Sequence, residues 1–110
     1  MNSYTRDLTI SSGSQATEVF DLGNAKTLAI FFPGTMTGTT VKLKAHKTMA
    51  DAGSYVARDD GAGDYSITVA AGKCVPLDAN SMAIPALRYL SIESQSAEAA
   101  DRALTVLVKE

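Results

Sequence analysis

Tryptophan is absent from the sequence, cysteine occurs once and proline three times among 110 residues. Because Cys74 has no partner within the chain, an internal disulfide is excluded and the fold does not depend on an oxidising compartment. The apolar runs are far shorter than the ~20 residues that cross a bilayer. Residues 1–7 also lack the apolar segment of a signal peptide. We therefore expect a soluble protein made in a cytoplasm, without a membrane partner.

An excess of charge of one sign is also lacking. Ten Lys and Arg side chains stand against twelve Asp and Glu side chains, for a formal net charge of -2. Nucleic-acid-binding proteins usually gather lysine and arginine into a dense cluster, and the sequence has none. We therefore expect no nucleic-acid partner. The length is that of one domain, residues 1–110, which can bury one core without disulfides or structural metal ions.

The sequence does contain three apolar runs in its middle, each closed by a glycine-rich segment. Residues 28–32 are apolar throughout, as in a strand covered on both faces. Residues 41–46 and 65–69 alternate apolar with polar side chains, which is the period of a strand with one wet face. On residues 41–46 this period predicts that Val41, Leu43 and Ala45 face the core while Lys42, Lys44 and His46 face water.

Further short strands are expected on both sides of this centre. They cover residues 4–10, 16–20, 54–57, 73–77, 89–93 and 103–109, with 73–77 at a sheet edge because Pro76 cannot donate to a ladder. Residues 59–64 read as a hairpin turn, and residues 1–4 as a mobile N-terminal arm. About eight short strands without a clear helix predict an all-β fold, an antiparallel β-sandwich or jelly roll.

Three aspartates in the expected turn, Asp59, Asp60 and Asp64, form the best candidate for an ion site. Calcium prefers six to eight oxygen ligands, and carboxylates among glycines could supply some of them. The spacing of a calcium-binding helix–loop–helix motif is not met, and a solvated turn accounts for the same residues. Both interpretations stay open, and we predict no metal site.

Candidate catalytic residues are few. His46 is the only histidine, and no His/Cys pair has the spacing of zinc ligands. A pair of His46 with Cys74 remains formally open, although Cys74 beside Val75 reads as a small buried hydrophobe and His46 as a water-facing position. Phosphate-loop, dinucleotide and nucleophile-elbow patterns fail. We therefore expect no enzyme activity, no cofactor and no small-molecule substrate.

Candidate protein-contact residues are easier to find. Lys42 and Lys44 begin a basic stripe that continues through His46 and Lys47, and such a stripe either meets an acidic partner or is a solvated face. Apolar groups that the core need not absorb also suggest contacts, although core packing remains the alternative for Phe31 and Tyr55. The predicted interface residues are Tyr4, Met36, Met49, Lys42 and Lys44.

A succession of spaced features runs over residues 21–109. It comprises Asp21-Leu22-Gly23, residues 32–38, residues 41–45, Asp59-Asp60-Gly61, residues 70–73, residues 87–92 and residues 100–104. In this succession the chain resembles small virion proteins of tailed bacteriophages. Within that group it is similar to the jelly-roll capsid decoration (cement or staple) proteins of short-tailed phages similar to epsilon15. It departs from their pattern at Met36, where tryptophan is common, and in the alanine enrichment before the last strand.

The resemblance implies a role on the outside of a virion. Such proteins bind the outer surface of an icosahedral shell of HK97-like major capsid protein, often as dimers at local two-fold axes, and clamp neighbouring capsomers. The family has no catalytic residues to carry over. Under this hypothesis the arm of residues 1–4 and the loops around Met36 and Met49 contact the capsid or a second copy.

Two other classes of function remain open. One is another virion component, such as a head-fibre base, a head–tail joining protein or a tail protein, because these also use β-sandwiches. The other is a carbohydrate-binding module or a small enzyme. A sugar site would favour exposed tryptophan or tyrosine platforms, and the absence of tryptophan counts against it.

Overall fold

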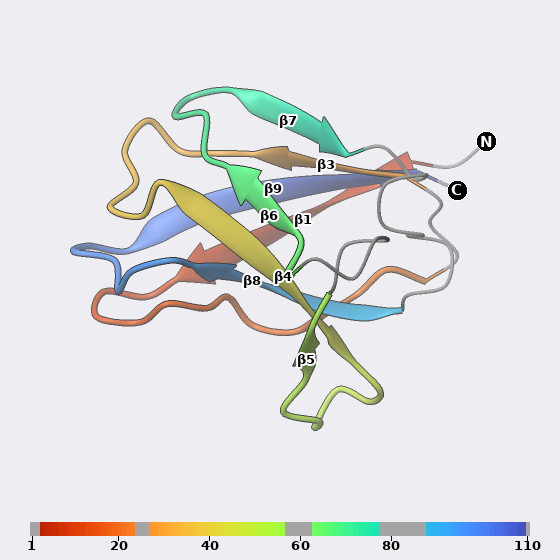
Figure 1. The fold of residues 1–110 in the computed structure, drawn as a ribbon. Coiled ribbons are helices and arrows are strands. Elements are labelled where there is room, and N and C mark those ends of the chain that lie inside the picture. Colours follow the sequence, from red (N-terminus) through yellow and green to blue (C-terminus); the bar gives the residue numbers. More distant parts are fainter. Residues whose placement is uncertain (1–2, 24–26, 57–62, 78–87, 110) are drawn as a thin grey trace.

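The computed structural model describes residues 3–23, 27–56, 63–77 and 88–109, and every regular element in these ranges is a strand. The strands are β1 (Ser3–Ile10), β2 (Phe20–Asp21), β3 (Thr27–Phe31), β4 (Thr40–His46), β5 (Ser54–Tyr55), β6 (Ser66–Thr68), β7 (Cys74–Leu77), β8 (Tyr89–Ser94) and β9 (Arg102–Lys109). They form two antiparallel sheets packed face to face (Figure 1). The predicted all-β sandwich of about eight short strands is therefore confirmed. The described residues contain no helix of membrane-spanning length and hydropathy.

The first sheet has the strand order β1-β9-β3-β7. Its longest pairing joins β1 to β9, from Ser3 opposite Lys109 to Ile10 opposite Arg102. β7 forms one edge, and there Pro76 lies opposite Ala29 of β3. Because proline lacks an N–H group, it is tolerated at this edge, as the sequence predicts.

The second sheet has the order β2-β8-β4, and both β5 and β6 pair with the remaining edge of β4. Tyr55 lies opposite Lys44, and Ser66 lies opposite Lys42. β5 and β6 thus follow each other along the same edge of β4. Residues 59–62 of the predicted hairpin turn lie outside the described residues. The Tyr65 N–H donates to the Val56 carbonyl at 2.7 Å, so these two described residues on either side of the turn lie side by side.

The core lies between the sheets and follows the alternation of the strands. The most completely buried side chains come from both sheets: Ile10, Leu22, Ile30, Val41, Leu43, Leu90, Ile92, Leu104, Val106 and Val108. Val41 and Leu43 are buried as predicted, whereas Ala45 is only half-buried. Each large aliphatic side chain removed from water here contributes roughly 1.5–3 kcal/mol to folding. This buried layer therefore stabilises the sandwich.

The predicted N-terminal arm needs correction. Ser3 and Tyr4 belong to β1, where Tyr4 pairs with Val108. The Tyr4 hydroxyl donates to the Leu22 carbonyl at 2.6 Å, and its ring packs against the core. The chain is therefore held from Ser3 onward, while Met1 and Asn2 lie outside the described residues.

Candidate interaction surfaces

One carboxylate organises the end of the sandwich at which β8 leads into β9. The side chain of Glu98 is 0% exposed, although it belongs to the connection between these strands. Its oxygens accept hydrogen bonds from the backbone N–H groups of Thr37 at 2.8 Å and Gly38 at 2.9 Å. The Ser94 hydroxyl donates at 2.8 Å and Arg102 Nε at 2.9 Å. No sequence motif marks Glu98 as a candidate residue.

The charge of Glu98 is stabilised by these donors. Burial by itself raises the pKa of the Glu98 carboxyl, but the hydrogen bonds from Thr37, Gly38, Ser94 and Arg102 outweigh it and lower the pKa to about 2. The carboxylate is therefore ionised at neutral pH and does not act as a proton donor there. Glu98 therefore acts as an anchor: it holds the neighbouring segments in place by accepting their hydrogen bonds.

Three loops are fastened around this anchor. The Ala99 N–H donates to Thr37 Oγ1 at 3.1 Å, and the Gly13 N–H donates to the Glu98 carbonyl at 2.8 Å. Asp101 Oδ1 accepts from the Ser12 N–H at 2.7 Å. Residues 11–14, 34–39 and 95–101 therefore form one hydrogen-bonded cluster, which we call the loop end; it lies on the left in Figure 1. Loops fixed on a rigid scaffold are well suited to binding.

Close packing within the loop end depends on Gly38. A Cβ atom at this position would lie 2.1 Å from Ser94 Oγ, which is one of the Glu98 donors. Met36, two residues earlier, packs against the core and is half-buried. The loop around Met36 is thus fixed before any partner arrives.

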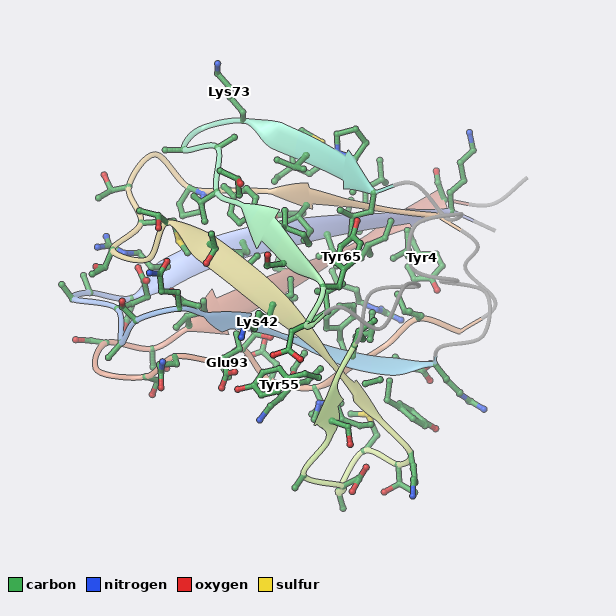
Figure 2. The ribbon with its side chains drawn as sticks, viewed as in Figure 1. Tyr4, Lys42, Tyr55, Tyr65, Lys73 and Glu93 are labelled. Atoms are coloured by element: carbon green, nitrogen blue, oxygen red, sulfur yellow. The ribbon has the colours of Figure 1, made fainter. Side chains whose placement is uncertain are left out.

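The outer face of the second sheet is charged but balanced. Figure 2 labels Lys42 and Tyr55 on this face. The Nζ atoms of Lys42 and Lys44 each lie 5.1 Å from the centre of the Tyr55 ring. Lys42 pairs with Asp64 at 3.0 Å and Lys44 with Glu93 at 3.9 Å. The basic stripe predicted from β4 alone is therefore neutralised by carboxylates from neighbouring segments.

Tyr55 is held as a neutral phenol on this face. Its hydroxyl donates to Glu93 Oε2, and this hydrogen bond raises the pKa of Tyr55 above its ordinary value. The ring itself is exposed, so Tyr55 is not a core residue, which was the alternative that the sequence left open. Such an aromatic group with a polar tip suits a protein contact.

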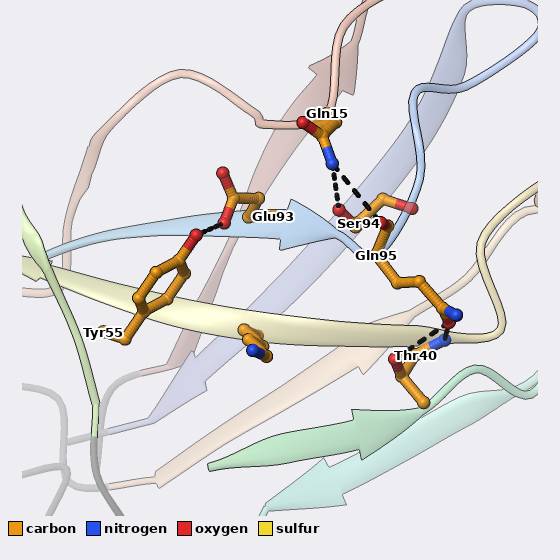
Figure 3. Close-up of a pocket in the computed structure, with 7 residues that line it drawn as sticks. Gln15, Thr40, Tyr55, Glu93, Ser94 and Gln95 are labelled. Carbon is orange, nitrogen blue, oxygen red and sulfur yellow. Dashed lines mark hydrogen bonds between the residues drawn. The ribbon is translucent and has the colours of Figure 1, made fainter. Parts of the chain in front are cut away.

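A shallow hollow of about 320 Å³ lies between this face and the loop end. It is lined by Gln15, Thr40, Lys42, Tyr55, Glu93, Ser94 and Gln95. Figure 3 shows Gln15 donating to the backbone of β8 and Gln95 accepting from Thr40. These groups can offer hydrogen bonds to a polar surface, but their side chains do not form a nucleophile–base pair.

His46 is buried, so the predicted water-facing position is wrong. Its Nδ1 lies 2.8 Å from the Asp51 carbonyl oxygen and its Nε2 lies 2.8 Å from Ser91 Oγ. The segment after β4 folds over this end of the face. Gly53, with φ +85°, sits so close that an added Cβ would lie 2.5 Å from the His46 ring.

Cys74 is exposed on β7, which corrects its predicted burial. It belongs to the edge strand of the first sheet, whereas His46 belongs to the second sheet. The structure therefore does not bring these two residues together as a catalytic pair.

The aspartate turn is described only at Asp64, which pairs with Lys42; Asp59 and Asp60 lie outside the described residues. Among the residues that are described, no group of three or more His, Cys, Asp or Glu side chains is placed to hold a metal ion.

The predicted interface residues do not form one surface. Lys42 and Lys44 lie together, but Met36 precedes β4 and Met49 follows it, so they belong to opposite ends of that strand. Met49 is 52% exposed, whereas Tyr4 is half-buried in the first sheet. Phe31, which the sequence left between core and contact, is 41% exposed.

Neither a protein-family model nor a curated protein matches this sequence. The solved structure of the SPBc2 prophage-derived protein YomS is similar in fold, with a TM-score of 0.61 over 98% of this chain and 95% of that chain at 16% identity. This likeness shows a shared fold over nearly the full length of both chains.

Two further solved structures are less similar. The Yersinia pseudotuberculosis-derived mitogen has a TM-score of 0.46 at 13% identity, covering 98% of this chain and 85% of that chain. The Schizosaccharomyces pombe Cnp3 cupin domain has a TM-score of 0.38 at 9% identity, covering 96% and 51%.

Proposed function

We propose that this chain is a bacteriophage virion protein that decorates and stabilises an icosahedral capsid. In this role it binds, as a homodimer, the outer surface of a shell of HK97-like major capsid protein. The observation that carries the proposal is the similarity of its fold to a prophage-derived protein, which extends over 98% of this chain and 95% of the other. The resemblance over residues 21–109 to capsid decoration proteins supports the same role.

The loop end is the surface that fits this role best. Its three loops are fixed by Glu98, so little conformational entropy is lost when they meet a partner. A shell presents many equivalent sites, and modest affinity at each of them is amplified once two linked copies bind together. The role involves no catalytic step, cofactor, nucleic acid, membrane or small-molecule substrate.

The runner-up is another virion component, such as a head-fibre base, a head–tail joining protein or a tail protein. A carbohydrate-binding role has less support, because the ring of Tyr55 already has two ammonium groups 5.1 Å from its centre. A sugar would have to displace them to stack on that ring.

The stoichiometry of purified virions tests the proposal. Stained gels of particles that carry this protein give its ratio to the major capsid protein. A copy number of the same order as that of the major capsid protein supports decoration. A copy number as low as that of the portal or tail proteins supports the runner-up. Absence of the chain from the particle contradicts both. Rebinding of the purified protein to shells that lack it gives an independent measure of occupancy.

A further inference from the structure

The first sheet has one long border that no described strand covers. β1 is its border strand, and β9 is the only described strand that pairs with it. The border strand on the other side, β7, has four residues including Pro76, and the second sheet ends in strands of two or three residues. Proteins usually shorten or block such borders, because a row of exposed backbone groups recruits another strand. β1 spans eight residues without proline, so it has neither protection.

A hydrogen bond at the end of β1 fixes which of its backbone groups face this border. In an antiparallel pair, alternate residues direct both their N–H and C=O groups to the neighbouring strand, and the residues between them direct both away. The Thr9 N–H donates at 3.2 Å to Oε1 of Glu18, which lies outside β9, so Thr9 faces away from β9. By the same alternation Thr5 and Asp7 face away from β9 as well.

The far side of the sheet gives the same orientation. The Phe32 N–H donates at 3.0 Å to the carbonyl of the residue before β7, so Phe32 faces β7 and Phe31 faces β9. Phe31 lies opposite Thr105, so Thr105 faces β3 and the next residue, Val106, faces β1. Val106 lies opposite Arg6, so Arg6 makes the hydrogen bonds to β9. The residues on either side of Arg6 are therefore left facing the outer border.

We propose that an extended segment of the major capsid protein adds to this border as a fifth strand of the first sheet. It exchanges hydrogen bonds with the backbone of Thr5 and Asp7, which together offer two N–H groups and two carbonyl oxygens. Strand addition takes its affinity from main-chain hydrogen bonds and its specificity from alternate side chains. The proposal rests on the proposed function for the identity of the partner, and it adds a second contact to that of the loop end.

The side chains of β1 define the chemistry of that segment. Directly opposed residues of opposite charge stabilise a strand pair, and like charges destabilise it. Arg6 and Asp7 are both exposed, and they project to opposite sides of the strand. The segment that fits best therefore has an acidic residue opposite Arg6 and, next to it, a basic residue or a hydroxyl opposite Asp7.

The charge of Arg6 is available to such an acidic residue. Its guanidinium carbon lies 4.9 Å from the centre of the Tyr4 ring. The carboxylate of Asp21, on the border strand β2 of the other sheet, already accepts from the Gly23 N–H at 2.7 Å and pairs with Arg88 at 3.4 Å. Within the part of the chain that the structure describes, no carboxylate forms an ion pair with Arg6.

The border of β1 is continuous with the loop end. β1 ends at Ile10, and residues 11–14 of the loop end follow it directly. Figure 1 shows β1, in red, leading from the N-terminal side of the molecule to that end. The four residues from Asp7 to Ser11 span ~13 Å of extended chain. A capsid segment that leaves a surface in contact with the loop end therefore reaches this border within a few residues.

Proline at position 5 tests the proposal. In Thr5→Pro the ring replaces an N–H that points away from β9, so no hydrogen bond between β1 and β9 is lost. Pro76 already occupies the equivalent position in β7, opposite Ala29, with its nitrogen directed away from β3. Thr5→Ala is the matched control, because it removes the same side chain and keeps the N–H. We expect Thr5→Pro to reduce occupancy on purified shells at least about tenfold, while Thr5→Ala leaves occupancy unchanged.

The outcomes on shells separate this proposal from the proposed function. Urea denaturation shows whether the two variants are folded to the same extent. Equal occupancy of Thr5→Pro and the unmodified protein overturns the strand addition and leaves the function intact. Equal losses in Thr5→Pro and Thr5→Ala also overturn it, since the threonine side chain would then make the contact. If the unmodified protein does not bind shells, the proposed function fails, and the strand addition fails with it.

Amide hydrogen exchange is a second measurement that needs no substitution. In the protein without shells, the amides of Thr5 and Asp7 should exchange at least about a hundredfold faster than those of Arg6 and Leu8, which face β9. On shells the first two amides should become protected, as read by NMR after the protein is released under quench conditions. Equal protection of both sets without shells overturns the proposal, because the border would already be covered. Unchanged exchange of Thr5 and Asp7 on shells overturns it as well.

Sedimentation of the purified protein detects the alternative occupant, a second copy of this chain. Self-association should be the same in Thr5→Pro and the unmodified protein, because the border of β1 is reserved for the capsid segment. If the unmodified protein associates and Thr5→Pro does not, a second copy fills the border, and the proposal is overturned.

Discussion

Oε1 of Glu98 lies 2.9 Å from Nε of Arg102, in an ion pair whose side chains are 0% and 15% exposed. The two residues are four positions apart, Glu98 in the connection between β8 and β9 and Arg102 at the start of β9. Because the pair is shielded from water, each partner would be left as an uncompensated charge if the other were removed. The stability of the loop end therefore depends on this contact.

Glu98→Gln should lower the free energy of unfolding by about 3 kcal/mol. The amide keeps the shape of the carboxylate, but it places N–H donors against the donors of Thr37, Gly38 or Arg102 and loses the charge. Urea denaturation followed by circular dichroism measures the change. Glu18→Gln is the control, since Glu18 is exposed and accepts only at 3.2 Å from the Thr9 N–H. Equal losses in the two variants would contradict the anchoring role.

Stability should fall in acid because of the same carboxylate. Its pKa of about 2 in the folded chain lies below the ordinary value of 4.5, so the folded state binds the proton more weakly than the unfolded state. The stabilisation is therefore complete above pH 4.5 and is lost as the pH falls through about 2. The shift corresponds to about 3 kcal/mol. Asp21 and Asp51 also have lowered pKa values, so the measurement is the difference between the unmodified protein and Glu98→Gln. That difference should vanish at the acid end, and a difference independent of pH would refute the assignment.

The sequence predicts those parts of the fold that are governed by local period and local chemistry. The alternation of Val41 and Leu43 gives their burial, and Pro76 gives the edge position of β7. Contacts between distant segments are not visible in this way. The backbone donors to Glu98 lie 60 and 61 residues away in sequence, so nothing near Glu98 marks it as buried.

The same limit explains the errors at the candidate site. The alternation along β4 places His46 on the water-facing side of the strand, but the loop through Gly53 folds over it and buries it. The balance of Lys42 and Lys44 depends on Asp64 and Glu93, which come from other segments. Cys74 reads as apolar, yet the register with Phe31 places it on the outer face.

Gly53→Ala should destabilise the protein more than Gly13→Ala. Both glycines have a left-handed backbone, with φ +85° and +82°, so each substitution carries a conformational cost of about 1 kcal/mol. A Cβ at Gly13 meets nothing within 4 Å, whereas a Cβ at Gly53 would lie 2.5 Å from the His46 ring. We expect an additional loss of about 1–3 kcal/mol for Gly53→Ala, the usual cost of overpacking. Thermal or urea denaturation of the two variants checks this, and equal losses would mean that His46 moves aside freely.

Contact with a shell should depend on the loop end and not on the opposite end of β4. Thr35 and Thr48 form a matched pair, since both are exposed threonines in loops, one preceding β4 and the other following it. Thr35→Glu introduces charge and bulk beside the Glu98 cluster, where the proposed capsid contact lies. We expect it to reduce occupancy on purified shells at least tenfold, about 1.4 kcal/mol per site. Thr48→Glu should leave occupancy unchanged.

These two positions are chosen because neither substitution disturbs the core. Met36 and Tyr4 pack against it, so alanine at either position would lower stability and binding together. Far-UV circular dichroism and urea denaturation should show both threonine variants folded to the same extent. If Thr48→Glu loses occupancy while Thr35→Glu keeps it, the shell contacts the other end of the sandwich.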